Sequence, residues 1–126
     1  MSVRTEITVR LPNSPGALTG VCGALASEHV GIAAMALDSG RVRLVVDNEV
    51  RAIAALRERY HQVDVRDVMV LRVSNAAGAV APVLALLANA GINIEYAYGA
   101  AAEGSAAALV VVGVDDPLRA ATLAGA

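Results

Sequence analysis

The stretch that decides the fold is Asn13-Ser14-Pro15-Gly16-Ala17-Leu18, which is repeated further along the chain as Asn75-Ala76-Ala77-Gly78-Ala79-Val80. The match then continues without a gap through these pairs: Val21 and Val83, Leu25 and Leu87, Val30 and Ile92, Ile32 and Ile94. A repeat of this length is a small domain rather than one unit of a solenoid. The sequence therefore predicts two tandem copies of one module, residues 1–66 and 67–126.

The composition excludes some classes of function. The chain has 126 residues, a formal net charge of −2 and only three aromatic side chains, all tyrosines. Nucleic-acid binders carry a clustered basic face, and single-strand binders add aromatic platforms for stacking, so no nucleic-acid partner is expected. The single cysteine rules out a disulfide within the chain. Since no secretory signal is visible, a cytoplasmic protein is expected.

Residues 73–94 form an uncharged run that is long enough to raise the question of a transmembrane helix. Three asparagines and a proline interrupt the run, and its large apolar residues fall on one stripe. An amphipathic helix followed by a strand explains this pattern better. No membrane partner is therefore expected.

The first half of the chain shows a clear order of elements. Residues 3–11 alternate between apolar and polar side chains, which is the period of a half-buried strand. Ser14 is predicted to cap the next helix and Pro15 to occupy its first position. The helix carries an apolar stripe made of Leu18, Val21, Cys22 and Leu25. Strands at 30–38, 41–46 and 62–66 are predicted, with a helix after Asp47 or Asn48 between the last two.

This order is strand, helix, strand, strand, helix, strand, which is the ferredoxin-like arrangement of an α+β protein. The second half repeats it from a strand at 67–73 to a helix after Asp115 or Asp116, but has no room for a last strand. The strand at 67–73 would then have a bare edge, which attracts another strand. We expect a partner chain or a strand of the first module to cover it. The alternative is a short, frayed edge protected by Arg66 and Arg72.

The motif Asn13-x-Pro15-Gly16-x-Leu18, followed by an apolar helix and a strand, resembles the ACT domain. The second copy resembles it through Gly91-Ile92-Asn93-Ile94. The resemblance covers almost the whole chain as two tandem modules. It implies a regulatory protein that binds small effectors, mostly amino acids, at interfaces between paired modules.

The turn also has properties that suit a ligand. A glycine at Gly16 and Gly78 lets the backbone approach a ligand closely, and the first N–H groups of the following helix would face an α-carboxylate. In serine-binding members of the family, one asparagine comes from the turn and another from the next strand of the partner module. Asn13 and Asn75 match the turn position. Asn93 matches the strand position, where the first copy has Gly31.

Only Asn13 facing Asn93 would supply both amides, so unequal sites are predicted, the better one containing that pair. The full set of predicted ligand-binding residues is Asn13, Ser14, Pro15, Gly16, Ala17, Leu18, Asn93, Ile94, Asn75 and Gly78. A structural explanation remains open for each asparagine. Asn13 and Asn75 would then only end a strand and cap a turn, and Asn93 would pair with backbone at a strand edge.

Signals for catalysis or for a bound cofactor are absent from the sequence. It shows no nucleophile–base pair, glycine-rich phosphate loop or set of metal ligands, so no catalytic residue, metal site or cofactor is expected. An acylphosphatase-like enzyme would need an arginine in the first turn, and residues 12–16 contain none. The expected protein binds an amino acid or similar metabolite and forms a homodimer. The alternative is an assembly module with degenerate sites, which acts on a metabolic enzyme or associates with itself.

Overall fold

The structure is a computed structural model that describes residues 2–123. Its elements are β1 (Ser2–Arg10), α1 (Ala17–Ser27), β2 (Ile32–Asp38), β3 (Arg41–Val46), α2 (Glu49–Arg57), β4 (Val63–Ser74), α3 (Ala81–Asn89), β5 (Ile94–Ala101), β6 (Ala107–Val114) and α4 (Pro117–Leu123). The predicted β-α-β-β-α-β order runs from β1 to β4, and it begins again at β4 and continues to α4 without a last strand of its own within residues 2–123. None of the helices within residues 2–123 is long and apolar enough to cross a membrane.

By their packing, the described residues form two compact units, one made of residues 5–66 and the other of residues 2–4 and 67–123. Strands β1 and β4 each run from one unit into the other. The order of hydrogen-bonded strands is β2-β3-β1-β4-β6-β5. That 1–66 and 67–126 are separate modules stays a prediction.

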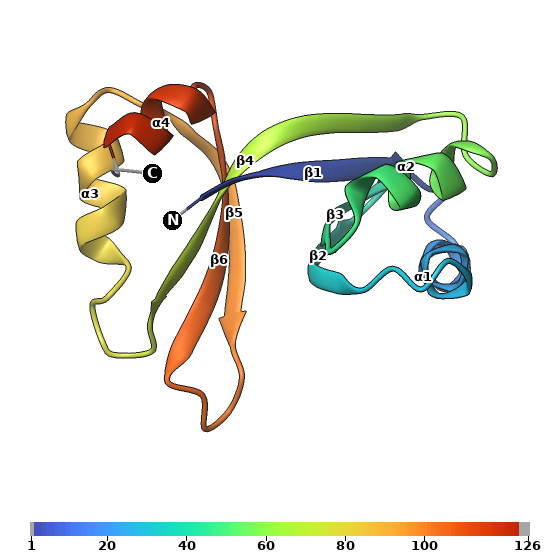
Figure 1. Ribbon diagram of the computed structural model, residues 1–126, viewed down its shortest axis with the longest axis horizontal. Helices are drawn as coiled ribbons and strands as arrows, with labels where there is room; N and C mark the ends of the chain where they lie inside the picture. Colours follow the sequence, from blue (N-terminus) through green and yellow to red (C-terminus); the bar gives the residue numbers. More distant parts are fainter. Residues whose placement is uncertain (1, 124–126) are drawn as a thin grey trace. The chain divides into compact units, whose positions relative to one another are not determined.

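In the unit of residues 5–66, β3 lies between β2 and β1 and is antiparallel to both. Ile7 is the partner of Leu44 and Val9 of Val42 in the β1–β3 pair, so these side chains share one face of the sheet. Helices α1 and α2 pack against each other and cover that face (Figure 1). The core consists of Ile7, Val9, Leu11, Val21, Ala24, Leu25, Val30, Val42, Leu44, Val46, Ala52, Leu56 and Val63.

The unit of residues 2–4 and 67–123 repeats this plan. Strand β6 is antiparallel to β4 and to β5, with Met69 opposite Val112 and Leu71 opposite Val110. Helices α3 and α4 pack on this sheet (Figure 1). The core consists of Met69, Leu71, Leu87, Ile92, Val112, Val114 and Ala120.

The strands predicted at 62–66 and 67–73 form one continuous strand, β4, because no glycine or proline interrupts residues 63–74. The edge of its second half is covered, as expected, by a strand that begins the first copy. Strand β1 is the hydrogen-bonded neighbour of β4, its first residues belong to the second unit, and Val3 packs against the second core. The start of β1 therefore takes the place of the last strand.

Candidate functional site

The first turn lies between β1 and α1. Gly16 has a φ of 83° and is the N-cap of α1, and no side chain caps this helix. The N–H of Ala17 donates to the carbonyl of Ser14 at 3.3 Å, and the N–H of Gly20 donates to the carbonyl of Gly16 at 3.1 Å. The predictions that Ser14 is the N-cap and Pro15 the first helical residue were wrong. The left-handed conformation at Gly16 places both residues ahead of the helix.

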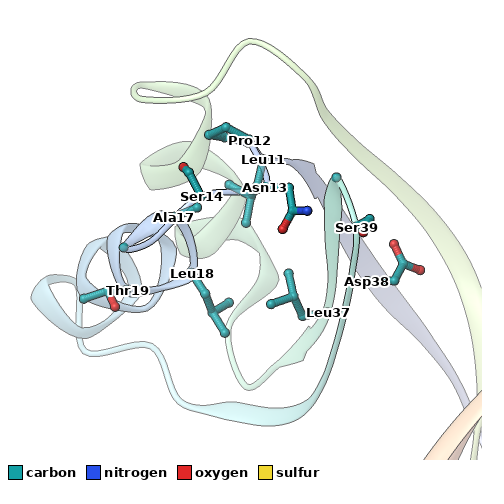
Figure 2. A pocket seen from close by; sticks show the side chains of 12 residues that line it. Leu11, Pro12, Asn13, Ser14, Ala17, Leu18, Thr19, Leu37, Asp38 and Ser39 are labelled. Atoms are coloured by element: carbon teal, nitrogen blue, oxygen red, sulfur yellow. The ribbon is translucent and has the colours of Figure 1, made fainter.

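A hollow of about 310 Å³ lies beside this turn. It is lined by Leu11, Pro12, Asn13, Ser14, Gly16, Ala17, Leu18, Thr19, Leu37, Asp38, Ser39 and Gly40 (Figure 2). The structure thus brings together five of the predicted site residues: Asn13, Ser14, Gly16, Ala17 and Leu18. Pro15 belongs to the same turn but does not line the hollow.

Two kinds of polar group belong to residues that line this hollow. The side-chain amide of Asn13 points toward the β2–β3 hairpin and lies above Leu37 in the view of Figure 2. Within the described part of the chain, this amide makes no hydrogen bond. The N–H groups of Leu18 and Thr19 lie in the first turn of α1, where a helix offers them no acceptor of its own. The site therefore presents an amide and a helix start that are open to a ligand.

The second wall of the hollow is the β2–β3 hairpin, which the sequence analysis did not include in the site. The sequence predicted strands at 30–38 and 41–46, but not their place beside the turn. That place is fixed by the N–H of Leu11, which donates to the carbonyl of Gly40 at 3.0 Å. Leu11 directly follows β1 and comes just before the turn, so this one bond ties the hairpin to the site.

Among residues 2–123, Asp38 is the one charged residue that lines the hollow. Its carboxylate forms ion pairs with Arg41 at 3.5 Å and Arg43 at 3.4 Å. Figure 2 shows this carboxylate directed away from Asn13 and Leu37. Arg43 also lies 4.0 Å from the carboxylate of Glu6, which is fully buried. The Asp38 carboxylate is therefore already neutralised and turned outward.

The second turn has the same backbone path but different contacts. Gly78 has a φ of 77°, and the N–H of Ala79 donates to the carbonyl of Ala76 at 3.2 Å. The side-chain amide of Asn75, however, donates to the carbonyl of Ser105 at 3.2 Å. The backbone N–H of Asn75 donates to the carbonyl of Ala106 at 3.0 Å. The predicted anchor Asn75 is thus held by the loop between β5 and β6.

Helix α3 begins at Ala81. Relative to the repeated motif, this start is later than the start of α1 in the first copy. The reason is Pro82, which matches Gly20. Gly20 makes the first helical hydrogen bond to Gly16, but proline has no N–H to donate to Gly78. The first helical bonds instead run from Val83 and Leu84 to the carbonyl of Val80, both at 3.2 Å. The second glycine turn is consequently separated from its helix.

A smaller hollow of about 220 Å³ lies at the β5–β6 hairpin, and none of residues 75–80 lines it. Its lining consists of Arg72, Ala100, Ala102, Ser105, Ala107, Ala108 and Leu109. The predicted ligand-binding residues Asn75 and Gly78 therefore do not line it.

Asn93 and Gly31 occupy equivalent places just before an edge strand. The N–H of Asn93 donates to Asp115 Oδ1 at 3.2 Å, and the N–H of Gly31 donates to Asp47 Oδ1 at 2.9 Å. A Cβ on Gly31 would lie 2.6 Å from Asp47 Oδ2, so the close carboxylate explains the glycine. The Asn93 side chain is exposed. Asn93 and Ile94 belong to the second unit and Asn13 to the first, so their meeting stays a prediction.

The two remaining helices, α2 and α4, are capped by side chains. These caps and the strand contacts of the neighbouring residues explain four acidic or amide positions. Asn48 accepts from the N–H of Arg51 at 3.1 Å, and Asp116 accepts from the N–H of Arg119 at 3.1 Å. The neighbouring Asp47 and Asp115 make the strand contacts described above. Among residues 2–123, no three His, Cys, Asp or Glu side chains are grouped so that they could hold a metal ion.

Comparison with known proteins relates both copies to one family. A family model described as an ACT domain pair matches residues 1–123. A comparison with the curated proteins finds no match. Protein BT0572 from Bacteroides thetaiotaomicron is 29% identical to this chain, covers 98% of it with 87% of its own length, and has a TM-score of 0.88.

Two regulatory subunits of aspartate kinase share the fold. The subunit from Thermus thermophilus, in its ligand-free form, is 19% identical, with 98% of this chain and 89% of that one covered and a TM-score of 0.72. The subunit from Thermus flavus is 18% identical, with 98% and 90% covered and a TM-score of 0.69. At this level of identity the likeness concerns the fold alone.

Proposed function

The chain belongs to the family of paired ACT domains, and on this premise we propose that it is a regulatory protein without catalytic activity that binds an amino acid or similar small metabolite. The observation that supports this most is the open first turn. There, an amide without a hydrogen-bond partner among residues 2–123 and a helix start without a side-chain cap border one hollow of about 310 Å³.

In this proposal, the ligand lies at the first turn. Its α-carboxylate accepts hydrogen bonds from the first N–H groups of α1, where the helix dipole also favours a negative charge. Its ammonium group donates to the side-chain oxygen of Asn13. Ser14, Gly16, Ala17 and Leu18 shape the cradle, and Pro15 stiffens the turn from behind.

The second polar anchor would come from a paired module. We propose that Asn93 and Ile94 of a second module close the site in a homodimer, so that the ligand lies at an interface between ACT modules. The turn with Asn75 and Gly78 would be the weaker site, since the Asn75 amide is engaged by Ser105. Ligand and assembly would then be coupled, because each stabilises the same interface.

A thermal-shift screen of the twenty amino acids on the whole chain tests this function. Binding at a hundredfold excess over the dissociation constant stabilises the folded state by about 2.7 kcal/mol, which gives a clear rise in melting temperature. The Asn13→Ala variant should lose the shift, and the matched Asn75→Ala variant should keep it. A flat screen, or a shift that survives Asn13→Ala, would contradict the proposal.

The second candidate is an assembly module with degenerate ligand sites, which acts on a metabolic enzyme or associates with itself. The bond between Asn75 and Ser105, together with glycine at position 31, favours it, because both remove an anchor from one site. Light scattering with and without the amino-acid mixture separates the two candidates. A dimer whose mass and stability do not change when any amino acid is added would support assembly alone. Under either candidate we place the protein in the cytoplasm.

A further inference from the structure

We infer that the hollow at the first turn selects an amino acid with an aliphatic side chain; this inference rests on the proposed function. It concerns the part of the ligand that differs from one amino acid to the next. The α-carboxylate and the ammonium group would be held by α1 and Asn13 whatever the side chain. Within this unit, selectivity must therefore come from the remaining wall of the hollow.

That wall contains three leucines, and Pro12, Thr19, Asp38, Ser39 and Gly40 complete it. Leu11 is only 7% exposed, and Leu18 is half-buried against the first core. Leu37 lies on the edge strand β2 opposite Val42, which is fully buried, so both side chains share the helix-covered face of the sheet.

Leu37 is 54% exposed, and Figure 2 shows it pointing toward Leu18 and Asn13 across the hollow. An apolar group placed there would remove water from Leu37 and Leu18 at once. Removing apolar surface from water is favourable in proportion to its area. The largest gain therefore comes from a ligand whose side chain fills the space between the two leucines.

The charges around the hollow disfavour an ionised side chain. Asp38 is the one charged residue in the lining, and its carboxylate is engaged by Arg41 and Arg43. It also points away from the hollow (Figure 2). A lysine, arginine, aspartate or glutamate ligand would bring its charge against leucines without a partner there, which is unfavourable.

The size of the hollow points the same way. A volume of about 310 Å³ lies at the lower end of ligand pockets, which run from about 300 to about 1,000 Å³. It is large enough for one free amino acid. Leucine, isoleucine, valine and methionine are therefore the ligands that this wall fits.

Calorimetric titration of the whole chain with leucine, alanine, lysine and aspartate tests the inference. Leucine should bind at least about 10-fold more tightly than alanine, the effect of extra methylenes in an apolar pocket, and the two charged ligands should bind more weakly than alanine. Lysine or aspartate as the tightest ligand would overturn the inference while leaving the proposed function intact. A flat thermal-shift screen of all twenty amino acids would instead overturn the proposed function itself.

A variant sharpens this test. Leu37→Asp places an unpaired carboxylate at the hollow, so leucine should lose about 10-fold in affinity and lysine should gain relative to it. Val50→Asp is the matched control, since Val50 is 77% exposed in the same unit and does not line the hollow. Melting curves of both variants verify that they fold. An unchanged ratio of leucine to lysine affinity in Leu37→Asp would overturn the inference.

Discussion

The two glycine turns follow the same backbone path and differ in what they leave open. At both turns a glycine has positive φ and the next N–H reaches back to the carbonyl three residues earlier. At the first turn, the asparagine amide faces a hollow and the helix begins at once. At the second, the amide is bonded to Ser105 and Pro82 delays the helix. A duplicated motif thus keeps its shape while one copy loses its free polar groups.

The largest expected effect is on the free energy of unfolding, and it shows whether the cores beneath the two turns are equivalent. Leu25 and Leu87 match in the repeat and are 0% and 1% exposed. Leu25→Ala and Leu87→Ala should each lower the free energy of unfolding by about 2–5 kcal/mol, because each leaves a cavity in a packed core. Urea denaturation of each variant measures this loss. A loss below about 1 kcal/mol in either variant, far outside that range, would show that one copy has no comparable core.

The next effect concerns the position that differs just before β2 and β5. Gly31→Ala should lower the free energy of unfolding by about 1.5 kcal/mol, because the new Cβ displaces Asp47 and breaks its hydrogen bond to the residue 31 N–H. Asn93→Ala is the control. Asn93 already carries a Cβ and is exposed, so its stability should change by less than about 0.5 kcal/mol. Equal losses in thermal denaturation would refute this explanation of the glycine.

The asparagines of the two turns should have opposite roles. Asn75→Ala should lower the free energy of unfolding by about 1 kcal/mol, since it removes the bond to Ser105. Asn13→Ala should change it by less than about 0.5 kcal/mol, since the Asn13 amide has no hydrogen-bond partner within the described residues. Melting curves without added ligand measure both effects. The comparison breaks down if Asn13→Ala is the more destabilising change.

The smallest effect concerns the helix start. Pro82→Ala restores an N–H that can donate to the carbonyl of Gly78, as Gly20 does to Gly16. The stability should change by only about 0.5 kcal/mol, because the position lies at the helix surface. The amide of residue 82 should nevertheless become protected from hydrogen exchange, which NMR can follow. A fast-exchanging amide at residue 82 would mean that proline is not what delays α3.

Much of the fold could be read from the sequence because its signals are local. Alternation predicted β1 and β3, apolar stripes predicted α1 and α3, and the repeat predicted that both copies share one topology. The errors also have local causes. Ser14 and Pro15 resemble a helix start, but the left-handed Gly16 comes after them, so the helix begins only after Gly16. Residues 62–66 and 67–73 looked like two strands because the repeat boundary falls between them.

The candidate site was only half visible in the sequence. Asn13, Ser14, Gly16, Ala17 and Leu18 were found because they form one continuous motif. The hairpin wall was missed, since one long-range bond from Leu11 to Gly40 brings it to the turn. The engagement of Asn75 by Ser105 was missed for the same reason, as the two residues are far apart along the chain.

The sequence by itself determined the elements, their order, their duplication and the glycine turns, because backbone conformation and apolar periodicity depend on near neighbours. Only the tertiary structure decided that the start of β1 covers the edge of β4, that Leu37 faces Leu18 across a hollow, and that one asparagine side chain makes no hydrogen bond within residues 2–123 while its counterpart does. Those features depend on strand pairing and on carbonyls brought from distant residues, and nothing in a local pattern specifies which distant group will arrive.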